Sequence, residues 1–185
     1  EMQFFVPPGT ELKFYEEWKQ KRLNWHLALG LGQENYKFHD HEKLAHYANA
    51  AADIEFKFPF GFKELEGIHS RTDFDLSAHE KFSGRKLQYF DPERNENYVP
   101  YVVETSIGLD RMFLALFSNC LKDEVLEDGS ERTVLSLPPA LAPVKAAILP
   151  LVKKDGLPEF AEKIFNDLKY DFNVISEEKD SIGKR

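Results

Sequence analysis

Cysteine is nearly absent from this 185-residue sequence, and long apolar runs are missing altogether. The single Cys120 cannot form an internal disulfide or a thiolate metal cage, which indicates a reducing compartment. No apolar stretch approaches the ~20 residues that a bilayer crossing needs, and the first residues lack the basic region and apolar core of a signal peptide. We therefore expect a cytoplasmic protein with no membrane partner.

Basic residues are also too few to coat the surface. The sequence has 24 Lys and Arg against 32 Asp and Glu, a net charge of −8, so nucleic acid can be held only by a local patch. The hydrophobic share of 42% is typical of a globular protein, and the length suits one domain or one plus part of another. The sequence opens inside a strand-like run and stops soon after another, so we expect a fragment of a longer polypeptide.

Hydrophobic patterning predicts mixed helix and sheet. After Pro7, aromatic and apolar residues at helical spacing predict an amphipathic helix that packs on a sheet through one face. The residues expected on this buried face are Phe14, Trp18, Trp25 and Leu29. The alanine-rich residues 43–52 favour a second helix. Residues 54–101, rich in aromatic and β-branched side chains and broken by turn residues, indicate an antiparallel sheet.

The composition changes after residue 122, from apolar to charged and turn-rich, and this change predicts two domains. Residues 101–106 read as a strand that passes through Gly108 into a buried apolar helix. Residues 123–132 are charged and turn-rich, as in a linker. Beyond them we expect a strand at 134–137, a helix starting near Pro143, a second helix and a final strand, the pattern of a parallel crossover unit. The expected division is therefore 1–122, a linker at 123–132, and 133–185.

The strand-to-helix junction at residues 103–111 is the strongest candidate site. Glu104 and Ser106 project from one face of the strand, while Thr105 projects from the other. Arg111 falls in the first turn of the helix, where free backbone N–H groups favour anions. An ammonium at Glu104 and a phosphate at Arg111 would fit this pattern. In the alternative interpretation, the two residues simply pair with each other or with neighbours.

Two further groups of residues are weaker candidates. Glu64 and Glu66, two apart in a strand, could face one cation, or could lie on a solvated outer face. Arg71 and Asp73 nearby could form a local salt bridge. The histidines at 39, 41 and 46 could hold a metal, but their spacing matches no zinc signature, and surface or capping roles are favoured. No protein motif for a metal is found.

The ordered segments resemble a known family. Residues 98–111 (YVPYVVETSIGLDR) resemble the third signature motif of class II aminoacyl-tRNA synthetases, and more narrowly the dimeric glycyl-tRNA synthetases. Residues 63–76 (KELEGIHSRTDFDL), 44–48 (LAHYA) and 135–143 (LSLPPALAP) are similar to that family too. The resemblance covers essentially the whole chain, from the end of the second motif into the anticodon-binding domain.

The resemblance implies an α+β fold: the C-terminal part of the catalytic domain on an antiparallel sheet, then a truncated α/β anticodon-binding domain. It implies that glycine and ATP form glycyl-adenylate, that the glycyl group passes to tRNA(Gly), and that Mg²⁺ accompanies ATP. Arg111 and Glu104 would be catalytic, Arg111 by holding the terminal ATP phosphate. Glycine would be contacted by Glu1, Glu104, Thr105, Ser106, Ile107 and Gly108. ATP would be contacted by Glu64, Leu65, Gly108, Leu109, Asp110 and Arg111.

The same resemblance implies what a fragment would lack. The first motif, which forms the homodimer interface, and the ATP-binding arginine of the second motif would lie upstream. The isolated chain is therefore expected to be inactive. The alternative from another class is a synthetase-like accessory or regulatory module that binds but does not catalyse. A metal enzyme built on the three histidines is a third, less favoured hypothesis.

Overall fold

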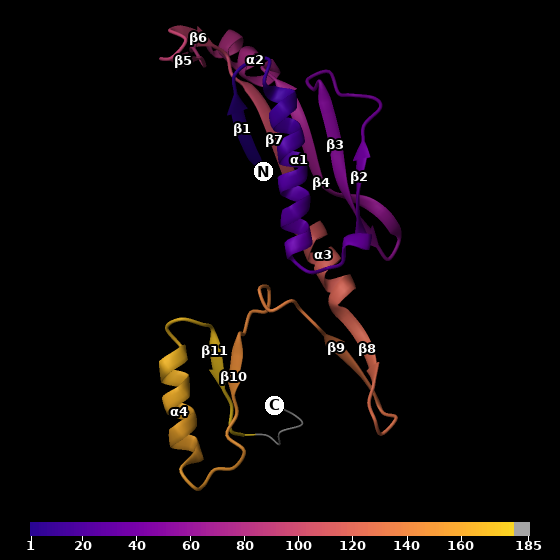
Figure 1. Cartoon of the computed structure of the whole chain (residues 1–185), viewed down its shortest axis with the longest axis vertical. Coiled ribbons are helices and arrows are strands. Elements are labelled where there is room, and N and C mark those ends of the chain that lie inside the picture. The colour runs from indigo at the N-terminus through magenta and orange to yellow at the C-terminus, as the bar shows by residue number, and fades with distance from the viewer. Residues whose placement is uncertain (180–185) are drawn as a thin grey trace. The chain divides into compact units, whose positions relative to one another are not determined.

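The computed structural model describes residues 1–179, which form two compact units divided between Ser136 and Leu137. In the first unit, five antiparallel strands form one sheet in the order β1-β7-β4-β3-β2, and helix α1 lies across one face of it (Figure 1). These elements are β1 (Met2–Val6), α1 (Glu11–Ala28), β2 (Tyr36–Asp40), β3 (Ala50–Phe58), β4 (Gly61–Thr72) and β7 (Tyr101–Ile107). The expected antiparallel sheet is confirmed.

Smaller elements surround this sheet. A 3-10 turn, η1 (Gln33–Asn35), precedes β2, and helix α2 (Phe74–Ser83) follows β4. A short hairpin of β5 (Tyr89–Asp91) and β6 (Glu96–Tyr98) leads into β7. Helix α3 (Leu109–Cys120) starts two residues after β7 ends, as the junction pattern predicts. Among residues 1–179, no helix combines the length and apolar character needed to cross a membrane.

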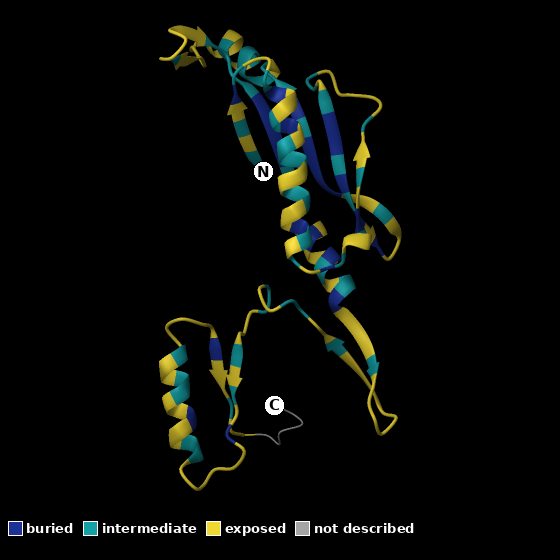
Figure 2. Cartoon of the chain, in the orientation of Figure 1, coloured by how far each residue is buried: buried dark blue, intermediate teal, exposed yellow. Residues whose placement is uncertain are grey.

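The core of the first unit lies between α1 and the sheet, where Figure 2 shows the central strands as buried. Ile54, Phe56, Ile68 and Val103 are at most 1% exposed. Each such side chain contributes roughly 1.5–3 kcal/mol by leaving water. α3 places Met112 and Ala115 inward, but Phe113 stays 66% exposed, so this helix is less buried than its apolar sequence predicts.

The buried face of α1 differs from the predicted one. Tyr15 and His26 are buried, whereas Trp25 is 43% exposed. Phe14 and Trp18 are half-buried and make edge contacts with Phe4 of β1 at 5.4 and 5.6 Å. The helix is rotated from the aromatic stripe because His26 pairs with a charged residue of the sheet (below), an interaction that hydrophobic spacing does not encode.

The predicted helix at 43–52 is wrong. Residues 50–58 form strand β3, and the residues before them form turns. β3 pairs with β2 on one side and β4 on the other, and Ala51 and Ala52 are buried within it. Backbone pairing on both edges outweighs the modest helix preference of alanine, which is a weak prior against tertiary context.

The charged segment after α3 is a hairpin rather than an open linker. β8 (Leu121–Val125) and β9 (Glu131–Leu135) pair antiparallel across the turn at Gly129, whose φ is +80°. The structure therefore ends the first unit at Ser136, and residues 134 and 135 of the strand expected at 134–137 belong to β9 of this hairpin. The turn residues predict a connection here, but not that the residues on either side of them pair as a hairpin.

The second unit contains a parallel pair of strands linked by a helix: β10 (Ala146–Ile148), α4 (Leu157–Leu168) and β11 (Val174–Ser176). The parallel pairing agrees with the predicted crossover, but one helix rather than two joins the strands, and the first strand is not the one expected at 134–137. The helix predicted from Pro143 is wrong, because Pro143 and Pro150 leave only a short stretch between them and its backbone pairs with β11. Residues 180–185, the end of the expected second domain, lie outside the described residues.

Candidate active site on the sheet face opposite helix α1

The sheet face opposite α1 carries most of the candidate residues, and we call it the polar face. Paired residues in neighbouring strands share a face, so the register assigns each side chain. His69 is opposite Glu104, and Gly67 is opposite Ser106, between β4 and β7. Gln3 of β1 is opposite Glu104 on its other side. The polar face therefore comprises Gln3, Asp53, Glu55, Glu64, Gly67, His69, Arg71, Glu104 and Ser106.

Glu104 is the centre of a hydrogen-bonded cluster on this face. Its side chain is only 7% exposed. The Nη1 atom of Arg71 donates to both carboxylate oxygens, at 3.1 and 3.3 Å. The amide of Gln3 donates to Oε2 at 3.2 Å. These contacts hold the carboxylate in one orientation, as a ligand-binding group requires.

Glu1 belongs to the same cluster. The Gln3 amide nitrogen that donates to Glu104 also donates to Oε1 of Glu1, at 2.9 Å. The carboxylates of Glu1, just before β1, and of Glu104 in β7 therefore meet at one amide group. Among residues 1–179, Arg71 supplies the one guanidinium that contacts Glu104, and it also donates to Asp75 at 2.8 Å. The cluster has an excess of negative charge, which suits a small cation such as an ammonium.

Arg111 lies in the first turn of α3, just beyond the C-terminal end of β7. Gly108 is the residue before α3, and a Cβ atom there would lie 3.6 to 3.8 Å from the Arg111 side chain. The Nη1 atom of Arg111 donates to the backbone oxygen of Glu64 at 2.7 Å and lies 3.2 Å from its carboxylate. Both side chains are 53% exposed. Such an exposed pair holds its partners weakly, so the guanidinium is available to an anion.

A cavity of about 360 Å³ adjoins Arg111. Its lining residues are Phe58, Phe60, Lys63, Glu64, Arg111 and Leu114. Two cations and two aromatic rings at one cavity suit an anionic ligand that carries a ring, since guanidinium binds phosphate oxygens and aromatic faces stack on planar rings. Phe58 and Phe60 already stack on each other, with centroids 5.2 Å apart.

Glu104 and Arg111 do not pair with each other. Each pairs with a neighbour instead, Glu104 with Arg71 and Arg111 with Glu64. Along an extended strand, the rise from residue 104 to 108 is about 13 Å. Glu104 therefore lies at the middle of β7, and Arg111 lies beyond the end of this strand in α3, with Ser106 between them along the chain.

Glu64 and Glu66 do not face one site. Between them the register with β3 shifts, with Glu66 opposite Ile54 and Glu64 opposite Glu55, so Leu65 is the extra residue of a β-bulge. Glu66 consequently points to α1, where it is completely buried. Burial alone would raise the pKa of Glu66, but hydrogen bonds from His26 and Arg22 outweigh it and lower the pKa below its usual value.

Several other predicted site residues present no side chain to the polar face. Thr105 is buried and, by alternation, lies with Ile107 on the α1 face. Leu65 is 1% exposed, whereas Leu109 is 82% exposed at the start of α3. Asp110 is also exposed, in the first turn of α3. Of the predicted site residues, Glu64, Glu104 and Ser106 have side chains on the polar face, Glu1 joins the cluster through Gln3, and Arg111 contacts Glu64.

Two of the three histidines lie together and the third does not. The ring centroids of His39 and His41 are 5.9 Å apart, and these rings lie near Glu55 and Asp53, whereas the His46 ring contacts Phe74 at 4.9 Å. Within residues 1–179, no group of three or more His, Cys, Asp or Glu is arranged to hold a metal ion.

Sequence reasoning missed three members of the cluster: Gln3, His69 and Arg71. The sequence suggests a salt bridge between Arg71 and Asp73, but in the structure Arg71 pairs with Asp75 and Glu104 instead. The hydrogen bond to Asp75 raises the pKa of Arg71 above its ordinary value. Alternation along β4 places the side chains of His69 and Arg71 on one face of the strand. Only the register between β4 and β7 shows that Glu104 lies on the same face.

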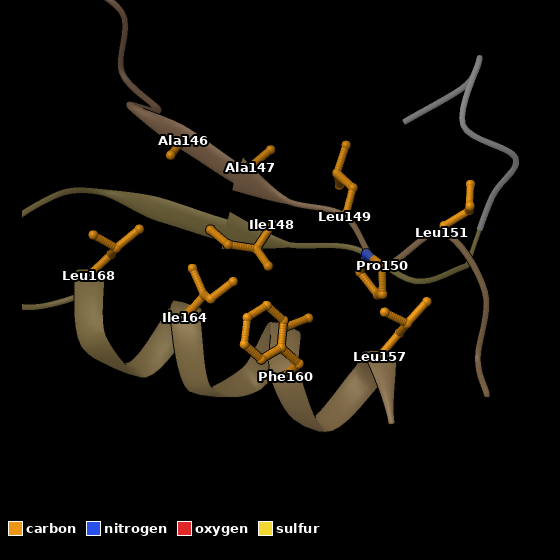
Figure 3. Close-up of a pocket in the computed structure, with 11 residues that line it drawn as sticks. Ala146, Ala147, Ile148, Leu149, Pro150, Leu151, Leu157, Phe160, Ile164 and Leu168 are labelled. Atoms are coloured by element: carbon orange, nitrogen blue, oxygen red, sulfur yellow. The ribbon is translucent and has the colours of Figure 1, made fainter. Parts of the chain in front are cut away.

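The second unit contains a larger cavity, about 590 Å³, between α4 and β10 (Figure 3). Leu157, Phe160, Ile164 and Leu168 of α4 point toward Ile148 and its neighbours. None of its lining residues is ionisable. This cavity offers apolar contact and no group for acid, base or charge chemistry.

Comparison with known proteins assigns the fold to a class. No family model matches the chain. The chain is similar in structure to the prolyl-tRNA synthetase of Giardia lamblia, solved in complex with prolyl-adenylate. The match has a TM-score of 0.59 and 16% identity, and it covers 98% of this chain and 36% of the synthetase chain. The fold is thus that of part of a class II aminoacyl-tRNA synthetase.

The sequence comparison is more specific. The chain is 52% identical over its full length to the glycine–tRNA ligase of Chlorobaculum tepidum and covers 39% of that protein. It is 50% identical to the glycine–tRNA ligases of Borrelia hermsii and Geobacillus thermodenitrificans, of which it covers 43% and 40%. The predicted resemblance is confirmed, because the chain is homologous to glycine–tRNA ligases over its whole length. It spans less than half of the length of each of these ligases.

Proposed function

We propose that this chain is the part of a glycine–tRNA ligase that binds glycine and the phosphates of ATP. The complete enzyme would join glycine to ATP as glycyl-adenylate and transfer the glycyl group to tRNA(Gly). The observation that carries the proposal is the pair of carboxylates, Glu1 and Glu104, joined through Gln3 on the same strand face that leads to Arg111. The homologous ligases support the choice of amino acid.

In this proposal the carboxylate cluster holds the glycine ammonium. Glu104 supplies the charge, Gln3 and Arg71 fix its orientation, and Glu1 adds a second carboxylate. Ser106, two residues further along the same face, offers a hydroxyl near the glycine carboxylate. Thr105, Ile107 and Gly108 would contribute only backbone groups, because the side chains of Thr105 and Ile107 lie on the α1 face.

Arg111 would hold an ATP phosphate. Its exposed guanidinium would exchange its contact with Glu64 for phosphate oxygens and stabilise the charge that develops as pyrophosphate leaves. Leu109 and Asp110 begin the same helix, and Glu64 and Leu65 border the adenosine side. Mg²⁺ bound to ATP is compatible with this donor set, because carboxylate oxygens such as those of Glu64 suit it. No residue is needed as a nucleophile, since adenylate formation depends on positioning and charge stabilisation.

The two units would divide the work. The first, through Ser136, would belong to the catalytic domain, and the second would begin the anticodon-binding domain. Binding of tRNA(Gly), formation of a homodimer and a cytoplasmic location are further parts of this proposal, and the names of the homologous ligases support the first of them.

The test is amino-acid-dependent ATP–pyrophosphate exchange by the full-length polypeptide. We expect exchange with glycine and none with alanine, serine or proline. Exchange with proline in place of glycine, or no exchange with any amino acid, would refute the proposal. If exchange is absent but calorimetry detects a non-hydrolysable glycyl-adenylate analogue, the accessory binding module becomes the better description. The isolated 185-residue chain should show no turnover, and robust exchange by it would contradict the assignment to a part of the site.

A further inference from the structure

His69 occupies the space between the carboxylate cluster and the rest of the polar face. It lies opposite Glu104 in the register of β4 and β7, and its Nδ1 atom is 3.8 Å from Oε1 of Glu104. On its other side, its ring centroid is 6.2 Å from that of His41. The side chain is 21% exposed, so the imidazole forms part of the surface that a ligand at Glu104 would meet.

The His69 ring leans over Gly67. A Cβ atom at position 67 would lie 2.8 Å from Cε1 of His69, closer than packed carbon atoms tolerate. Gly67 is buried although it has no side chain of its own, which agrees with cover by the imidazole. Because Gly67 is opposite Ser106, the ring extends along the strand from Glu104 toward Ser106.

The charge state of His69 suits a site for a cation. Burial lowers its pKa below the usual value of 6.5, against the opposing effects of Glu104 and Asp53. Nearby His41 and Arg71 lower it further. An uncharged ring does not compete with an ammonium for Glu104, so it can border the site closely without neutralising it. Its Nδ1 atom is buried without a hydrogen-bond partner.

We propose that His69 is a specificity-determining residue that closes the β4 side of the glycine site by its volume. This inference rests on the proposed function and adds a residue to it. Glycine has no side chain to recognise, so a larger amino acid can be rejected only by filling the space that its Cβ atom would need. The imidazole fills that space beside Glu104 and Ser106, and Gly67 leaves room for the ring.

The test compares alanine with glycine in ATP–pyrophosphate exchange by the full-length polypeptide carrying His69→Ala. We expect the ratio of kcat/KM for alanine to that for glycine to rise at least about 10-fold, the discrimination typical of one methyl group, chiefly through a lower KM for alanine. Both amino acids are measured on the same preparation, so a reduced fraction of folded enzyme cancels from the ratio.

Two further variants separate volume from chemistry. His69→Leu keeps the bulk and removes the nitrogens, and we expect its alanine-to-glycine ratio to stay within about twofold of the parent. Gly67→Ala added to His69→Ala returns a methyl group to the vacated space and should lower the ratio again. Equal changes in the His69→Ala and His69→Leu variants, an unchanged ratio in His69→Ala, or loss of all activity in both would overturn the inference. Failure of the proposed function is distinct, because the parent itself would then show no glycine-dependent exchange.

Discussion

His26 of α1 and Glu66 of β4 form a 2.7 Å hydrogen bond with both side chains fully excluded from solvent. Arg22 reaches the same carboxylate at 2.6 Å. A buried charge is tolerated only when it is paired, and this pairing fixes how α1 sits on the sheet. It also explains why the aromatic stripe of α1 is only half-buried.

Removing the Glu66 carboxylate should therefore destabilise the first unit. We expect Glu66→Ala to reduce the free energy of unfolding by about 3 kcal/mol, because it leaves His26 and Arg22 without their acceptor. Trp18 and Trp25 both lie on α1, so their fluorescence in a urea titration reports on this unit. The matched control is Glu64→Ala, two residues away and 53% exposed, which should cost less than about 1 kcal/mol. Similar losses in both variants would contradict the assigned roles.

Stability should also depend on pH through His69. Its pKa is lowered in the folded state, so below pH 6.5 the unfolded chain takes up this proton first and stability falls as the pH falls. Glu66, whose folded pKa lies below its usual 4.5, loses its contribution only at lower pH. Urea titrations between pH 5 and 7 should show a shallower decline for His69→Leu than for the parent. Equal slopes would mean that His69 titrates normally.

Arg111→Ala should lower glycine-dependent ATP–pyrophosphate exchange by roughly 100-fold to 1,000-fold, as expected for a lost charge-stabilising donor. Its control is Arg132→Ala, another half-exposed arginine, which pairs with Glu124 at 2.8 Å in the β8–β9 hairpin. Arg132→Ala should leave exchange unchanged. If both variants lose activity equally, the effect comes from general surface charge rather than from phosphate binding at the start of α3.

Glu104→Gln should raise the KM for glycine by at least about 30-fold, because it removes the charge that holds the ammonium while keeping the shape of the side chain. Arg71 keeps its contact with Asp75, so the fold should tolerate the change. Glu131→Gln, an exposed change in β9, serves as the control. A raised KM for ATP with an unchanged KM for glycine would assign Glu104 to the other substrate.

The strand-to-helix junction was predictable because its signals are local. Alternation placed Glu104 and Ser106 on one face, and Gly108 marked the turn before α3, in agreement with the structure. Their partners were not predictable in this way. Gln3 is 101 residues from Glu104 in the chain and Arg71 is 33, and neither pairing follows from spacing.

The errors share a physical cause. Alanines at 50–52 favour a helix locally, but pairing with the neighbouring strand makes them part of β3. The aromatic residues of α1 indicate a buried face, but the hydrogen bond between His26 and Glu66 turns a different face of the helix to the sheet. The parallel crossover of the second unit was predicted, but its first strand was not, because β10 is only three residues long and lies where a helix was expected. Long-range pairing decided each of these points.

The single additional residue in β4 interrupts the alternation of side chains, so that Glu64 and Glu66 point to opposite faces of the sheet. Leu65 thereby lets one short stretch of chain carry an interior anchor at Glu66 and a surface partner for Arg111 at Glu64. In a regular strand, residues two apart share a face, so without this bulge both acids would point to the same side of the sheet and one of the two roles would be lost.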